Sequence, residues 1–80
     1  MTTTWDDALG LALDLVRALR AEGNGAGASA LLAALTAGCS APELALALRE
    51  AALDLEEPLP EPVRQRQAAL LSGLQDVLGG

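Results

Sequence analysis

Apolar residues recur every three or four positions along most of this chain, and that period predicts helices. Four such stretches are separated by segments rich in glycine or proline, and they predict helices at about 4–22, 27–37, 41–57 and 62–78. The connecting segments are short, which favours antiparallel packing of neighbouring helices. The pattern therefore predicts an all-α fold, a small four-helix bundle that forms one domain over residues 1–80.

The third predicted helix has the most strongly marked start. Ser40 and Glu43 have the spacing of a capping box, in which each residue satisfies a backbone N–H of the other. Pro42 falls in the first turn, where its missing N–H has no intrahelical partner to lose. Cys39 and Leu44 have the spacing of a hydrophobic staple. These signals together predict that the helix begins directly after Ser40.

This third helix is apolar on two sides. One side is predicted to carry four residues at helical spacing: Leu44, Leu48, Ala51 and Leu55. Leu46 and Leu53 fall on nearly the opposite side, seven residues apart. A helix that is apolar on both sides is normally buried on both, so we expect the helix at about 40–57 to be central in the bundle. Two interpretations of Leu46 and Leu53 remain open here, namely intramolecular core and an interface with another chain.

In each of the other three predicted helices, the apolar residues indicate one broad apolar face. In the first helix, which Thr4 is expected to cap, that face comprises Trp5, Ala8, Leu9, Ala12, Leu13, Leu15, Val16 and Leu19. In the second, it comprises Leu31, Leu32 and Leu35, with small residues on the reverse at Ala30, Ala33 and Ala37. Because the second helix carries no charge, we expect it to be mostly covered. In the last helix, the apolar face comprises Val63, Leu70, Leu71, Leu74, Val77 and Leu78.

The size and composition of the chain predict a thin core. Eighty residues bury only about 60–65% of the surface that the unfolded chain exposes, and Trp5 is the only aromatic residue. Domains this small often need a disulfide, a metal or a second subunit for stability. One cysteine cannot form an internal disulfide, and there is no histidine to bind zinc. A second chain is the remaining candidate, so we expect a homodimer.

The charge and the N-terminal sequence bear on partners and location. The formal net charge is −6, with five arginines and no lysine. This balance argues against nucleic acid and anionic membranes as partners, because both attract clustered basic residues. No signal peptide and no membrane-spanning stretch are visible, and a lone thiol fits a reducing compartment. We therefore expect a cytoplasmic protein, and the use of arginine without lysine suggests a GC-rich bacterial genome.

Candidate catalytic chemistry is sparse. Histidine, lysine and tyrosine are absent, which removes the usual general bases, so we expect no enzyme activity, no cofactor and no metal site. Cys39 has no histidine to deprotonate it and is interpreted as part of the staple. The run 23–27, Gly-Asn-Gly-Ala-Gly, follows a helix and lacks the lysine of a phosphate-binding loop, so it is interpreted as a helix stop.

The length, the acidity and the four predicted helices resemble acyl carrier proteins. That family carries its cofactor on a serine in an Asp-Ser-Leu motif at the start of a helix. The corresponding segment here is Gly27-Ala28-Ser29-Ala30, which lacks both the aspartate and the leucine. This alternative predicts a phosphopantetheine adduct on Ser29.

The third predicted helix, the Leu-Pro link after it and the last helix are similar to small helical immunity proteins of bacterial toxin systems. This resemblance implies a non-enzymatic protein that masks a cognate partner, as an immunity or antitoxin-like subunit. The alternative is an adaptor whose function is to dimerise with itself. The expected protein-binding residues are the second apolar side and the acidic cluster beside the prolines: Leu46, Arg49, Glu50, Leu53, Asp54, Glu56, Glu57 and Glu61.

Overall fold

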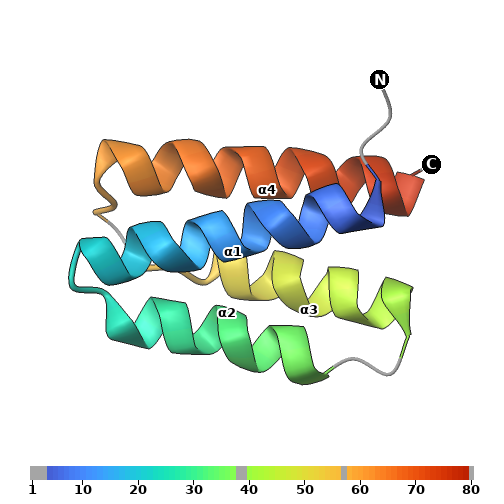
Figure 1. Cartoon of the computed structure of the whole chain (residues 1–80), viewed down its shortest axis with the longest axis horizontal. Coiled ribbons are helices and arrows are strands. Elements are labelled where there is room, and N and C mark those ends of the chain that lie inside the picture. The colour runs from blue at the N-terminus through green and yellow to red at the C-terminus, as the bar shows by residue number, and fades with distance from the viewer. Residues whose placement is uncertain (1–3, 38–39, 57, 80) are drawn as a thin grey trace.

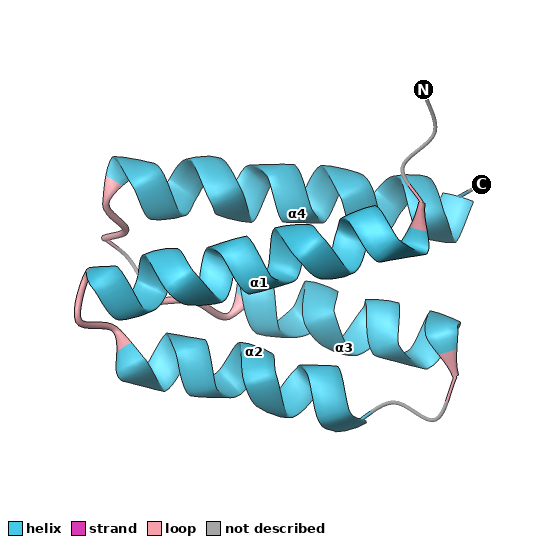
Figure 2. Cartoon of the chain, viewed as in Figure 1, coloured by secondary structure: helices cyan, strands magenta, loops and turns pink. Residues whose placement is uncertain are grey.

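The computed structural model describes residues 4–37, 40–56 and 58–79, and all regular structure in these residues is helical (Figure 2). Each helix runs antiparallel to the one before it, so the chain passes up, down, up and down through the bundle (Figure 1). The helices are α1 Trp5–Ala21, α2 Gly25–Ala37, α3 Ala41–Leu53 and α4 Glu61–Gly79. The predicted all-α four-helix bundle is confirmed.

Each helix packs mainly against two neighbours. Helix α1 lies against α2 and α4, and α3 lies against the same two helices from the opposite side of the bundle. The four helices therefore surround a shared core, and none of them occupies its centre. The expectation that the helix at about 40–57 is central is wrong, because α3 has neighbours on one side only.

Leucine and alanine side chains from all four helices build the core. No polar or charged side chain within the described residues is buried in it. The largest fully buried side chains are Leu15 and Leu19 from α1, Leu31 from α2, Leu48 from α3, and Val63, Leu70 and Leu74 from α4. Burying one leucine contributes roughly 1.5–3 kcal/mol relative to exposure, so the fold is stabilised by many similar apolar contributions rather than by a polar network.

Helix α1 begins with a complete capping box. The Asp7 N–H donates to Thr4 Oγ1 at 3.2 Å, and the Thr4 N–H donates to Asp7 Oδ2 at 3.3 Å. At the start of α3 the Glu43 N–H donates to Ser40 Oγ at 3.4 Å. The Ser40 N–H and the Glu43 carboxylate, both described, do not form the reciprocal bond, so the capping box predicted there is half formed. The staple predicted between Cys39 and Leu44 includes a residue outside the described part of the chain.

A three-residue turn joins α1 to α2. Gly23 has a φ of +77°, and the Asn24 N–H donates back to the Leu19 carbonyl at 2.8 Å. This hydrogen bond spans six residues, and a second one runs from the Gly23 N–H to the Arg20 carbonyl. Together they form a Schellman motif, which ends a helix at a residue with left-handed geometry. Asn24 then caps the next helix, because its Oδ1 accepts from the Gly27 N–H at 2.9 Å. Helix α2 consequently begins at Gly25, two residues earlier than predicted.

Helix α2 is covered on one side only. The residues that it buries are Gly27, Ala28, Leu31 and Ala34. The alanines predicted to admit another helix on the reverse side, Ala30, Ala33 and Ala37, are exposed. The expectation that an uncharged helix is mostly covered is wrong here, because both neighbours of α2 pack on its other face.

The link from α3 to α4 contributes to the core. Helix α3 ends at Leu53 with Asp54 as its C-cap, several residues before the predicted end at 57. Prolines at 58 and 60 disfavour helical geometry in the residues before them. Leu55 and Leu59, which lie between α3 and α4, are buried and are 8% and 6% exposed.

A side chain of α4 holds the end of α3. Gln67 Nε2 donates to the Ala52 carbonyl oxygen at 2.6 Å, and the bond is partly buried. Ala52 lies in the last turn of α3, where carbonyl groups have no partner within the helix. Gln67 therefore satisfies an unpaired carbonyl and fixes the end of α3 against α4.

Candidate protein-binding surface

The outer side of α3 carries two exposed leucines. Leu46 is 48% exposed and Leu53 is 55% exposed, whereas Leu48 on the opposite side of the same helix is fully buried. Within the residues that the structure describes, the second apolar side of α3 is therefore not covered. Of the two interpretations left open by the sequence, intramolecular core is wrong for these two leucines.

Arg49 and Glu50 lie between the two leucines on the same side of α3, and both are exposed. Steps of three and four residues place all four on one side of a helix. We call this surface the α3 strip, and it comprises Leu46, Arg49, Glu50 and Leu53. Its two leucines are two helical turns apart, or about 10 Å along the axis.

A groove between α3 and α4 continues the α3 strip. It has a volume of about 510 Å³ and is lined by Arg49, Leu53, Leu71, Gln75, Leu78 and Gly79. Leu78 is 39% exposed, although the sequence placed it on the core face of the last helix. Leu71 and Leu78 are seven residues apart, the same spacing as Leu46 and Leu53. Val63 and Leu70 on the same helix have this spacing too and are fully buried, so the spacing alone could not have identified Leu78 as part of a surface.

The predicted acidic cluster is only partly brought together. Asp54 and Glu56 are exposed and line one hollow of about 210 Å³, between the start of α2 and the end of α3. Glu61 is the first residue of α4, and its carboxylate accepts from Gln65 Nε2 at 3.3 Å. Glu57 lies outside the described residues. The structure thus supports an acidic pair at the end of α3, beside the α3 strip.

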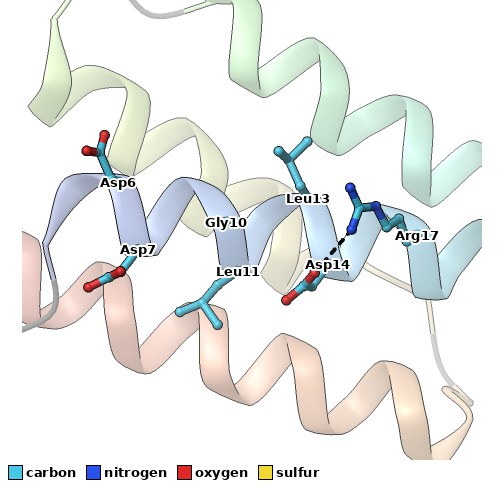
Figure 3. Close-up of a pocket in the computed structure, with 7 residues that line it drawn as sticks. All are labelled: Asp6, Asp7, Gly10, Leu11, Leu13, Asp14 and Arg17. Carbon is cyan, nitrogen blue, oxygen red and sulfur yellow. Dashed lines mark ion pairs between the residues drawn. The ribbon is translucent and has the colours of Figure 1, made fainter.

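A second hollow of about 520 Å³ lies on the outer side of α1 (Figure 3). Every residue that lines it comes from α1, including Leu13 and the exposed ion pair between Arg17 and Asp14 at 3.8 Å. Leu13 is 44% exposed, so its predicted place on the inner face is wrong. The buried arc of α1 is centred near Leu15 and Leu19, and Leu13 lies well outside it. Because one helix forms this hollow, it is shallow and offers no second wall.

The structure also locates the remaining residues considered for chemistry. Ser29 is exposed in the second turn of α2, not at the start of a helix. The glycine-rich segment 23–27 forms part of the connection between α1 and α2 and the first residues of α2. Cys39 is outside the described residues. Among the described residues, no group of three or more carboxylate or thiol side chains could hold a metal ion.

Neither a protein-family model, nor a curated protein, nor a solved structure matches this chain. None of the helices in the described residues is long and apolar enough to cross a membrane.

Proposed function

We propose that this chain is a non-enzymatic protein-binding subunit, and that the α3 strip and the adjoining groove form its binding surface. The observation that supports this is the distribution of exposed leucines. Leu13, Leu46, Leu53 and Leu78 are the large hydrophobic residues exposed among the described residues, and three of these four lie along α3 and the groove. Contiguous exposed apolar surface is typical of protein interaction sites, whereas single exposed residues are not informative.

The energetic gain from covering this surface is substantial for so small a fold. Leu46 and Leu53 are each about half exposed, so a partner that buries them fully adds about 1 kcal/mol or more for each one. A bundle of this size has a total stability of only about 5–10 kcal/mol. Binding at the α3 strip would therefore increase the stability of the folded chain measurably.

The chemistry around the α3 strip favours a partner with basic residues at its edge. Glu43, Glu50, Asp54 and Glu56 are exposed on or beside α3, and Arg49 is the one basic residue among them. The whole chain has a net charge of −6. Complementary charge around an apolar centre accelerates association and selects the partner. In its most specific form, the proposal is an immunity or antitoxin-like subunit that masks a basic cognate partner in the cytoplasm.

The experiment begins with the partner. Immobilised protein is used to capture binding proteins from cells of the source organism, the captured proteins are identified by mass spectrometry, and the candidate is purified. Its affinity is then measured by isothermal titration calorimetry against the wild-type chain, against Leu46→Glu with Leu53→Glu, and against Leu13→Glu. The last variant is a control, because it places one such carboxylate at an exposed leucine on a different helix.

We expect the α3 double variant to bind more than about a hundredfold more weakly, because it places two carboxylates in an apolar contact. Leu13→Glu should change the affinity by less than about twofold, since surface substitutions away from an interface have small effects. Far-UV circular dichroism should show the same helicity for all three proteins. Unchanged affinity in the α3 double variant refutes the proposed surface.

The acidic residues beside the prolines are tested separately. Reversing the charge of Glu56 together with Glu57 should reduce the association rate for a basic partner, because rim charges act mainly on the encounter. Asp14→Arg with Glu22→Arg, two exposed acidic residues of α1 and its C-cap, is the control with the same change in net charge. Equal effects of the two double variants would show that only the total charge matters.

A further inference from the structure

We draw no further inference here: the strongest candidate, the apolar groove between α3 and α4 with the exposed α3 strip beside it, is an unpartnered surface, and nothing in the described part of the structure shows what covers it.

Discussion

The hydrogen bond from Gln67 to the end of α3 gives the clearest test of how this small bundle is held together. Gln67 Nε2 lies 2.6 Å from the Ala52 carbonyl oxygen, and the bond joins residues 15 positions apart in the chain. Replacing Gln67 with alanine removes the donor and leaves that carbonyl without a protein partner. Gln65→Ala is a matched control, because it is the same substitution on the same helix at an exposed position.

The expected cost follows from the position of the bond. A net hydrogen bond contributes about 0.5–1.5 kcal/mol, and an unsatisfied buried partner costs about 1–3 kcal/mol. Because water can reach part of this helix end, we expect Gln67→Ala to lower the free energy of unfolding by about 1–2 kcal/mol. For a domain of this size, that corresponds to a fall in Tm of about 5–15 °C.

The control should behave differently. Gln65 Nε2 donates to Glu61 Oε1 at 3.3 Å on the exposed side of α4. Such a contact is worth about 0.2–0.5 kcal/mol, and alanine recovers a similar amount through its higher helix propensity. We therefore expect Gln65→Ala to change the free energy of unfolding by less than about 0.5 kcal/mol.

Urea unfolding followed by circular dichroism measures both variants, and linear extrapolation gives the free energy of unfolding for each. Gln67→Glu adds a further comparison, because it keeps the size of the side chain but presents an acceptor to the Ala52 carbonyl. It should destabilise the bundle more than Gln67→Ala at neutral pH. Equal losses for Gln67→Ala and Gln65→Ala would show that the bond between α3 and α4 contributes nothing to stability.

Four further predictions concern three glycines and one leucine in the link between α3 and α4. Gly10→Ala should raise the free energy of unfolding by about 0.5–1 kcal/mol, because an added Cβ meets nothing within 4 Å and alanine favours the helix. The free energy of unfolding of Gly27→Ala should be at least about 1 kcal/mol lower than that of Gly10→Ala, because the added Cβ would lie 2.9 Å from Leu55 Cδ2. Gly23→Ala should lower it by about 1 kcal/mol, because φ is +77° there. Leu59→Ala should lower it by about 2–4 kcal/mol although the residue lies in a link, because the side chain is 6% exposed. Urea unfolding measures all four variants, and equal values for the two helical glycines would contradict the packing argument.

Local sequence signals were sufficient to predict the number and approximate position of the helices. Gly23 supplies the left-handed residue that ends α1, and the prolines after residue 57 prevent α3 from continuing into α4. The period of leucines also predicted that Leu46 and Leu53 lie opposite Leu48 on the third helix. These features depend on residues that are close in the chain, so the sequence alone contains them.

Tertiary structure alone decided which apolar surfaces are covered. A helical pattern fixes the positions of residues around one axis, but the number and placement of neighbouring helices determine which arc is buried. Because α3 packs against α2 and α4 on one side only, Leu46 and Leu53 remain exposed, although their pattern is also that of a buried helix. For the same reason Leu59 enters the core from a link whose local sequence shows no helical period. Leu55, which the helical pattern placed on the inner side of the third helix, is also buried, although α3 ends before it. Burial depends on contacts between distant parts of the chain, and these form only when the four helices assemble.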